Sequence, residues 1–323
     1  MTTLCTLQSA FESCSYDALN RVLSKTDRNG LTTVYEYDAV GNLVKETAPD
    51  GVTEYVYDAA NRVVEVKENS VSAQNISYTR YGEVSSADYG GYRVEYLYDA
   101  FGNKIKTQFL GEQVLYTYDE MNRAKTVESN GVTTAYTYDL NGNTAKAETG
   151  AVSAEYEFNA LNLPVRQTNK AGASTEVNTY SYDALGRVTE KNENGLVTAY
   201  VYDDLGRLSA AAEGERLTEY VYDTRSNRVG KTVTEGEAVL TESYAYDQNG
   251  RLLTLTSNGI ESSFTYDANG NQTNVVKGSE TESYVYDGKN RLLESDINGT
   301  ENTYSYYPGG LRKTKDGTTY IYD

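Results

Sequence analysis

The chain repeats one pattern of aromatic, polar and turn-forming positions along almost its whole length. In the stretch Tyr35-Glu36-Tyr37-Asp38-Ala39-Val40-Gly41-Asn42, two aromatic residues flank one variable residue, and an aspartate and a short turn follow. Close copies lie at 55–63, 96–105, 200–208 and 244–252. Residues two positions apart on a strand share a face. The pattern therefore predicts a strand that ends at the aspartate, and its fixed period predicts a repeat architecture.

The residue after the second aromatic serves as the anchor of each repeat. Sixteen anchors can be aligned; ten of the fifteen gaps between them are 20 residues, two are 21, two are 24 and the last is 16. Thirteen anchors are aspartate, whereas Thr79, Asn159 and Tyr307 depart from the pattern. The sixteen anchors are Asp17, Asp38, Asp58, Thr79, Asp99, Asp119, Asp139, Asn159, Asp183, Asp203, Asp223, Asp247, Asp267, Asp287, Tyr307 and Asp323.

The turn after each anchor, here named the anchor turn, has a restricted third residue. That residue is glycine or asparagine in fourteen of fifteen copies, among them Gly41, Gly102, Gly186, Gly206, Gly250 and Gly270. Glycine and asparagine best tolerate positive φ. The slot therefore predicts a left-handed position in a type I turn closed by a bulge. The exception is Ser226, where we expect a turn that is one residue longer.

A second strand follows, as in 43–46 and 251–254, and then a second tight turn, here named the closing turn. The closing turns carry Asp50-Gly51, Asn130-Gly131, Asn194-Gly195, Asn258-Gly259 and Asn298-Gly299, which are strong hairpin signals. No long segment has a helical period. We therefore expect an all-β fold of tandem β-hairpins. Open sheets rarely exceed about ten strands without curling or splitting, so a sheet of this length is expected to curl.

Two regions are expected: an irregular N-terminal lead over residues 1–15 and an array of about sixteen units over residues 16–323. The chain is expected to begin part-way into a repeat and to stop in mid-repeat without a cap. Cys5 and Cys14 in the lead are two incidental thiols or, in an exported protein, a disulfide pair.

Charge and composition exclude several partners. The 47 acidic residues outnumber 29 Lys and Arg residues, which gives a net charge of −18. This balance argues against nucleic acids and anionic membrane surfaces and favours a solvated outer face. No run is long enough to span a bilayer, and no signal peptide is recognisable.

The repeated aspartate is the obvious candidate for chemistry, but an aspartate before a tight turn accepts N–H bonds from that turn. A calcium site is the alternative, although the chain lacks a dense acidic loop. Histidine is absent, which excludes His-based triads and the usual zinc sites. A glycosidase carboxylate pair would be hidden among equivalent acids. We therefore assign no catalytic, cofactor-binding or metal-binding residue and expect no enzyme.

The expected structural anchors are the second tyrosine, the aspartate and the turn glycine of each regular copy. They are Tyr37, Asp38, Gly41, Tyr57, Asp58, Tyr98, Asp99, Gly102, Tyr118, Asp119, Tyr138, Asp139, Tyr182, Asp183, Gly186, Tyr202, Asp203, Gly206, Tyr222, Asp223, Tyr246, Asp247, Gly250, Tyr266, Asp267, Gly270, Tyr286 and Asp287.

The 32 tyrosines, against five phenylalanines and no tryptophan, admit two interpretations. They form aromatic ladders that supply the packing of the sheet, or they face solvent in rows that stack on sugars. The arginine that often follows the turn either stacks on a tyrosine or is a solvated charge; these are Arg21, Arg62, Arg123, Arg187, Arg207, Arg251 and Arg291.

The motif Tyr-x-Tyr-Asp-Ala-x-Gly-Asn/Arg-Leu at a period of about 20 resembles the YD repeat, or RHS repeat, of Rhs and WapA-like polymorphic toxins, Tc toxin C components and teneurins. The resemblance covers residues 16–323. In that family, a spiralling strip of hairpins closes into a hollow shell that, in bacterial members, encloses a C-terminal toxin. For this chain the resemblance implies a spiralling sheet that forms a partial or open β-shell. The run 304–323 also resembles the approach to the Rhs-associated core, but the Asp-Pro-x-Gly signature of that core does not occur.

The resemblance implies a non-enzymatic shell segment that would encapsulate and present a C-terminal effector absent from this chain. Its partner would be its own or a downstream toxin domain, and its location would be secreted or at the cell surface. The alternative is an extracellular repeat module that binds carbohydrate or a target-cell surface. An enzyme of glycosidase type is the third and least favoured interpretation.

Overall fold

The computed structural model of the protein describes residues 2–5 and 12–322. In this part of the chain there are thirty-two β-strands and no helix, so the all-β prediction is confirmed. The chain divides into two compact units, which comprise residues 1–96 with 262–323 (unit 1) and residues 97–261 (unit 2). Both units are built from the same two-stranded repeat.

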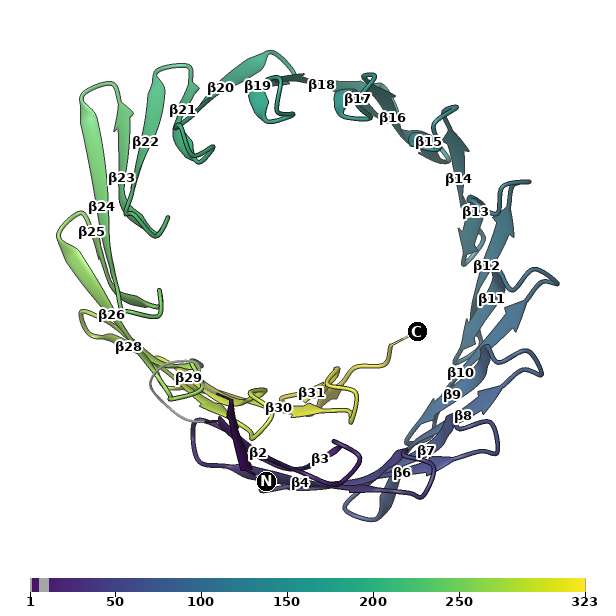
Figure 1. The fold of residues 1–323 in the computed structure, drawn as a ribbon. Helices are drawn as coiled ribbons and strands as arrows, with labels where there is room; N and C mark the ends of the chain where they lie inside the picture. The colour runs from purple at the N-terminus through teal and green to yellow at the C-terminus, as the bar shows by residue number, and fades with distance from the viewer. Residues whose placement is uncertain (1, 6–11, 323) are drawn as a thin grey trace. The chain divides into compact units, whose positions relative to one another are not determined.

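Within each unit the strands form a meander in which consecutive strands pair antiparallel, as in β19–β20, β20–β21 and β21–β22 (Figure 1). In β20–β21, for example, Thr198 pairs with Glu213 and Tyr202 with Leu208. The register shifts between Val201 and Tyr202, which is the bulge expected just before the anchor. Because the turns alternate along a meander, the anchor turns lie on one long side of the strip and the closing turns on the other. These are named the anchor side and the closing side.

The strand bounds follow the sequence repeat. The first sixteen strands are β1 (Thr2–Cys5), β2 (Glu12–Tyr16), β3 (Val22–Thr26), β4 (Thr32–Tyr37), β5 (Leu43–Ala48), β6 (Gly51–Tyr57), β7 (Val63–Glu68), β8 (Val71–Tyr78), β9 (Val84–Tyr89), β10 (Tyr92–Tyr98), β11 (Lys104–Phe109), β12 (Glu112–Tyr118), β13 (Ala124–Ser129), β14 (Val132–Tyr138), β15 (Thr144–Thr149) and β16 (Val152–Phe158). The others are β17 (Pro164–Ala171), β18 (Ser174–Tyr182), β19 (Val188–Glu193), β20 (Leu196–Tyr202), β21 (Leu208–Glu213), β22 (Arg216–Tyr222), β23 (Arg228–Glu235), β24 (Ala238–Tyr246), β25 (Leu252–Ser257), β26 (Ile260–Tyr266), β27 (Gln272–Lys277), β28 (Glu280–Tyr286), β29 (Leu292–Ile297), β30 (Thr300–Tyr306), β31 (Arg312–Lys315) and β32 (Thr318–Thr319).

The strip has little enclosed core. Val66, Ala87, Val94 and Val233 are among the few buried apolar side chains. The accessible surface is 19795 Å², whereas a compact protein of this mass would expose about 13,000 Å². A sheet that is one layer thick explains this excess, because neither of its faces is fully covered.

The two faces of the strip differ. Along Tyr200-Val201-Tyr202 of β20, both tyrosines are half-buried, whereas Val201 between them is 56% exposed. The same alternation ends β22, where Val221 is 60% exposed between Tyr220 and Tyr222. One face therefore carries packed tyrosines, and the reverse face carries accessible β-branched side chains.

The closing turns match the expectation in most copies. The Asn-Gly closing turns are confirmed as type I′, since both residues have positive φ, for example 52° at Asn194 and 102° at Gly195. A hairpin also closes at Asp50-Gly51 as expected, but Gly51 pairs with Ala48 across the turn, so Pro49 and Asp50 form its centre. No described helix is both long enough and apolar enough to cross a membrane.

The N-terminal lead contains strands as well. β1 and β2 pair antiparallel within this segment, which the sequence predicts to be irregular, with Thr3 opposite Cys14. Cys14 is a buried free thiol. Residues 6–11 of the lead lie outside the described residues.

Candidate functional site

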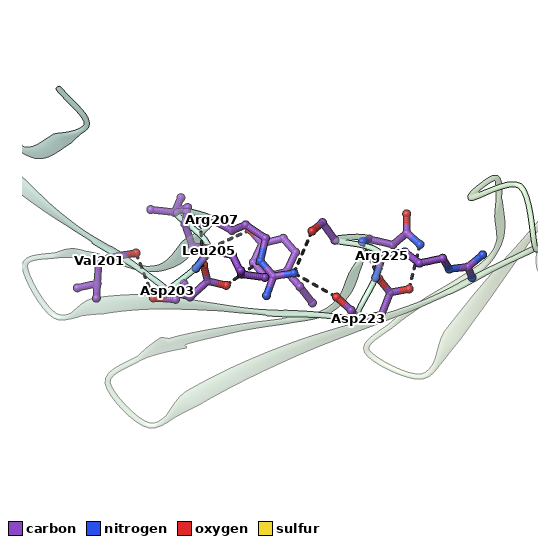
Figure 2. A network of polar contacts seen from close by, with 11 residues as sticks. Val201, Asp203, Leu205, Arg207, Asp223 and Arg225 are labelled. Carbon is purple, nitrogen blue, oxygen red and sulfur yellow. Dashed lines mark hydrogen bonds and ion pairs between the residues drawn. The ribbon is translucent and has the colours of Figure 1, made fainter. Parts of the chain in front are cut away.

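The anchor turn is the chemical unit that the chain repeats. In the copy at 203–207, Oδ1 of Asp203 accepts the N–H groups of Leu205 and Arg207 at 3.0 and 2.9 Å. Oδ2 of Asp203 accepts Nε–H of Arg207 at 2.7 Å (Figure 2). The carboxylate therefore satisfies two backbone donors and one guanidinium donor.

The same geometry recurs at the other aspartate anchors. Oδ1 of the anchor accepts the N–H groups of the second and fourth following residues at 2.8 to 3.0 Å in Asp17, Asp38, Asp58, Asp99, Asp119, Asp139, Asp183, Asp223, Asp247 and Asp287. Oδ1 of Asp267 accepts the N–H of Asn271. The anchor Asn159 accepts the equivalent two N–H bonds.

The prediction of a left-handed third residue is confirmed. Gly206 has a φ of 80° and donates its N–H to the carbonyl of Asp203 at 2.9 Å. Positive φ also occurs at Gly41, Gly102, Gly186, Gly250 and Gly270. The longer turn expected at Ser226 is wrong: Ser226 has a φ of 66° and donates to Asp223 as in the other copies. Its hydroxyl accepts Nη1–H of Arg207 at 3.2 Å, and this bond helps to hold serine in an unfavourable backbone region.

The anchor turn at 203–207 is also bonded to the next repeat. Arg207 donates from Nη1 to the carbonyl of Asp223 at 3.1 Å (Figure 2), and its guanidinium lies 4.6 Å from the centre of the Tyr222 ring. The Tyr222 hydroxyl donates back to the carbonyl of Leu208 at 2.8 Å. These three contacts join consecutive repeats independently of the strand ladder.

The tyrosine contacts recur along the array. The hydroxyl of the second tyrosine donates to a backbone carbonyl of the preceding repeat at 2.5 to 2.9 Å in Tyr37, Tyr57, Tyr78, Tyr118, Tyr138, Tyr182, Tyr202, Tyr222, Tyr246 and Tyr306. Tyr98, Tyr266 and Tyr286 occupy the same place at the ends of β10, β26 and β28. An arginine lies over the ring of Tyr37, Tyr78, Tyr138, Tyr202, Tyr222 and Tyr306. Tyrosine hydroxyl bonds and arginine–tyrosine contacts thus join consecutive repeats in many copies.

The fourth residue after one anchor is correlated with the third residue of the next anchor turn. The pattern of a single repeat does not contain this correlation. Where the fourth residue after an anchor is arginine, the third residue of the next turn is glycine in Arg21–Gly41, Arg62–Gly82, Arg123–Gly142, Arg187–Gly206, Arg251–Gly270 and Arg291–Gly310. Where the fourth residue is asparagine, the next third residue is asparagine in Asn42–Asn61, Asn103–Asn122, Asn143–Asn162 and Asn271–Asn290. The signal lies in the sequence and emerges only when adjacent copies are compared.

The structure explains the asparagine combination, since the asparagine amide donates to the next asparagine, as from Asn143 Nδ2 to Asn162 Oδ1 at 3.0 Å. For the arginine combination, crowding is seen at Gly206, where an added Cβ would lie 3.2 Å from Nη1 of Arg187. At Gly41, Gly82 and Gly142 the corresponding distance is 3.9 Å, which is an ordinary contact. The exceptions are Arg207 before Ser226, Asn227 before Gly250, Glu83 before Gly102 and Leu163 before Gly186.

The anchor carboxylates of Asp203 and Asp139 are held in the ionised state by lowered pKa values. The N–H of Arg207 lowers the pKa of Asp203, with help from the Arg207 guanidinium. The Asn143 side-chain amide has the same effect on the pKa of Asp139. Hydrogen bonds to the charged form produce this direction of shift. A carboxylate of this kind is a poor general acid or base near neutral pH.

Acidification is expected to destabilise the array through these anchors. A carboxyl group with a lowered folded pKa contributes stability that is complete above its unfolded pKa of about 3.9 and is lost as the pH falls through the folded pKa. The urea midpoint should therefore fall between about pH 4 and pH 2. Urea unfolding followed by circular dichroism at constant ionic strength measures this. An unchanged midpoint over that range would contradict the geometry.

Other candidates for chemistry are weak. Within residues 2–5 and 12–322, no group of three His, Cys, Asp or Glu side chains could hold a metal ion. Burial and a hydrogen bond to Glu242 raise the pKa of Tyr244 to about 12. The hydrogen bond to Glu282 and burial raise the pKa of Tyr284 in the same way. Neither phenol is therefore activated as a nucleophile or base.

Unit 1 contains a second set of polar contacts, between turns that lie about 240 residues apart. Asn269 accepts the N–H of Arg28 at 3.0 Å and donates to Oδ2 of Asp27 at 2.8 Å. Reciprocally, Asn29 accepts the N–H of Ala268 and donates to Oδ2 of Asp267, each at 3.0 Å. The closing turn 27–30 thus binds the anchor turn 267–270 through four bonds.

Two further contacts extend this turn-to-turn contact. Lys289 Nζ lies 3.0 Å from Oε1 of Glu46, and Arg291 lies 3.7 Å from a carboxylate oxygen of Asp50. Further along, the Tyr307 ring lies edge-on to Tyr89 at 5.2 Å between centroids. The closing side of β3–β9 therefore packs on the anchor side of β26–β31, which sequence spacing alone does not indicate.

Replacing Asn269 with alanine is expected to weaken the turn-to-turn contact by about 1–3 kcal/mol, because Arg28 N–H and the Asp27 carboxylate each lose a partner. The matched control is Asn249→Ala, at the same position of the turn 247–250. Faster hydrogen exchange in 27–31 for Asn269→Ala alone is the expected result. Equal exchange in both variants would show that the four bonds contribute nothing.

The comparisons with known proteins agree with this repeat geometry. The RHS Repeat model matches residues 16–53, 37–70 and 246–282. The Teneurin YD-shell model matches residues 103–239. The chain is a YD-repeat protein. No curated protein sequence matches it.

Solved structures share the fold. The YD-repeat chain is similar to the crystal structure of TcdB2-TccC3-Cdc42 with a TM-score of 0.69 and 13% identity over 96% of its length. It resembles the Photorhabdus luminescens Tc holotoxin pore with a TM-score of 0.67 and 13% identity over 95% of its length. A third match, TcdB2-TccC3 without its hypervariable C-terminal region, has a TM-score of 0.59 and 12% identity over 92%. The YD-repeat chain spans only 22%, 21% and 22% of those chains, respectively.

Proposed function

We propose that this YD-repeat chain is a non-enzymatic wall segment of an exported polymorphic toxin, and that it wraps and shields a C-terminal effector. The observation that carries the proposal is the use of the repeated polar groups. In the copy at 203–222, the Asp203 carboxylate bonds within its own turn, Arg207 bonds to the next repeat, and the Tyr222 hydroxyl bonds back to the preceding repeat. A wall requires the same joining contacts in repeat after repeat, whereas an enzyme needs one site that differs from the others.

The single-layer strip supports the same function. Its faces are only partly covered, so a long strip presents a large area to whatever lies beside it. The structurally similar protein TcdB2-TccC3 has a hypervariable C-terminal region. A variable segment of that kind, encoded downstream of the YD repeats, is the partner that we propose here.

Protease protection tests this function. The natural reading frame that contains the chain, with all that it encodes downstream, is expressed and treated with proteinase K. The downstream segment is expected to survive in the intact protein and to be digested after mild denaturation or when expressed alone. Digestion at the same rate in the intact protein and in isolation would overturn the proposal.

The carbohydrate-binding alternative lacks a supporting observation. Of the tyrosines, Tyr81 and Tyr92 are the strongly exposed ones, at 73% and 40%. The tyrosine pairs at the strand ends are half-buried beneath arginines and neighbouring strands, as Tyr222 is beneath Arg207. They do not present the open aromatic faces that stack on sugars.

A further inference from the structure

The anchor side of unit 2 carries a row of exposed apolar side chains. At the second position of the anchor turns, Phe101 is 82% exposed, Met121 73%, Leu161 69%, Leu185 78% and Leu205 72%. In the remaining turn of this run, the apolar residue is at the first position, where Leu140 is fully exposed. Such a series of large exposed apolar residues marks an interaction surface.

The turn itself does not require an apolar residue at this position. Only the backbone N–H of Leu185 is used, in its bond to Asp183. Elsewhere in the chain the position is polar at Asn141, Arg225, Asn249, Asn269 and Lys289, and it is apolar or aromatic at Leu19, Val40, Ala60 and Tyr81. In unit 1, the polar Asn269 and Lys289 face polar partners on a closing side, whereas Leu19, Val40 and Tyr81 are each 73% exposed, like the row in unit 2.

The closing side of unit 2 has a corresponding row. Leu110 lies in a closing turn and is 71% exposed. The first residue of the strand after a closing turn is also apolar in several repeats: Val132 is 57% exposed, Val152 55%, Leu196 51% and Ile260 55%. Each long side of unit 2 thus has exposed apolar residues, although on the closing side the same position is Glu112, Ser174 or Arg216 in other repeats.

From these rows we infer that two copies of this chain associate side to side, with the anchor side of unit 2 in one copy on the closing side of unit 2 in the other. Unit 1 provides the precedent, since its anchor turn 267–270 packs on the closing turn 27–30 of the same chain. The spacing argues for a second copy as the occupant. Residues two strands apart recur at about 10 Å, and another strip of the same repeats matches that spacing along its whole side.

The size of the surface is adequate. The six residues of the anchor-side row together expose on the order of 1,000 Å², against about 800 Å² per partner in a specific interface. The contact is head-to-tail, so each added copy leaves one side free, and association continues beyond a dimer. The net charge of −18 opposes it, so added salt should promote association by screening this repulsion.

Sedimentation and light scattering of purified protein test the inference. The wild-type mass should rise above 35.7 kDa with protein concentration, and more strongly at about 0.5 M than at about 0.05 M salt, which correspond to Debye lengths of about 4 and 14 Å. A mass that stays monomeric at every concentration and salt level would overturn the inference.

Two variants separate the surfaces. Leu161→Asn, Leu185→Asn and Leu205→Asn together alter the anchor side, using a residue that Asn249 shows the turn accepts. Val132→Thr, Val152→Thr and Leu196→Thr together alter the closing side, using the residue present at Thr300. Val201→Thr with Val221→Thr, on the exposed reverse face, is the control and should associate like the wild type.

Each triple variant alone should remain monomeric, and an equimolar mixture of the two should form a dimer and nothing larger, because only one matching pair of sides remains. Circular dichroism confirms that each variant is folded. A mixture that stays monomeric while the wild type associates would contradict the head-to-tail contact, as would either variant associating like the wild type.

Discussion

Replacing Tyr307 with aspartate should destabilise the turn-to-turn contact of unit 1 by about 3 kcal/mol, although it restores the residue found at thirteen other anchors. The Tyr307 residue is only 4% exposed. Its ring meets Tyr89 at 5.2 Å and Tyr322 at 6.5 Å, and its hydroxyl donates to the carbonyl of Tyr320 at 3.0 Å. Aspartate would lose this packing and place a charge among aromatic rings.

Hydrogen exchange followed by mass spectrometry measures the effect in the strands that meet at Tyr307. Exchange in β9 and β31 should accelerate in Tyr307→Asp. The matched control is Asn159→Asp, which restores aspartate at another unusual anchor and keeps both N–H bonds. The control should change exchange little. If Tyr307→Asp protects these strands as well as the wild type does, Tyr307 is only a degenerate anchor.

Disrupting the arginine–glycine combination of two neighbouring anchor turns should have the second large effect on the free energy of unfolding. Gly206→Asn adds a Cβ 3.2 Å from Nη1 of Arg187, and a cost of about 1–2 kcal/mol is expected from crowding in a closely packed contact. Asparagine tolerates the φ of 80° at this position, so the cost comes from the arginine. Combining Gly206→Asn with Arg187→Asn recreates the pair formed by Asn143 and Asn162.

A double-mutant cycle measures this coupling. The double variant should be more stable than the sum of the two single effects predicts, by about 1 kcal/mol. Arg187→Asn alone should also cost stability, because the guanidinium bonds Asp183 and lies over the Tyr202 ring. Urea unfolding of the four proteins gives the four free energies. Additivity within about 0.3 kcal/mol would show that the combinations in the sequence have no energetic basis.

The sequence can predict the repeat because its determinants are local. The strand ends, the type I′ Asn-Gly turns and the left-handed slot depend on residues within a few positions of one another, and glycine and asparagine mark them directly. The prediction of a longer turn at Ser226 is wrong because serine rarely adopts positive φ and so does not mark the slot. The support for Ser226 comes from Arg207 in the preceding repeat.

Contacts between distant turns could not be predicted in this way. Asp27-Arg28-Asn29-Gly30 is a closing turn with the sequence of an anchor turn, and nothing nearby in the sequence indicates that it binds the turn 267–270. For the same reason, the sequence shows Tyr307 as a departure from the pattern and gives no sign of its contacts. Such contacts form between turns that are far apart in the sequence, and no single repeat encodes them.

The proposed wall is tested most directly by a zero-length cross-link within unit 1, because a wall segment requires the sides of the strip to meet. A carbodiimide should join Lys289 to Glu46, whose charged atoms lie 3.0 Å apart. Lys231 and Glu242, 3.2 Å apart within one hairpin, provide the control link. We predict both links in the isolated monomer, shown to be intramolecular with isotope-labelled mixtures. The Lys231–Glu242 link without the Lys289–Glu46 link would contradict the proposed wall.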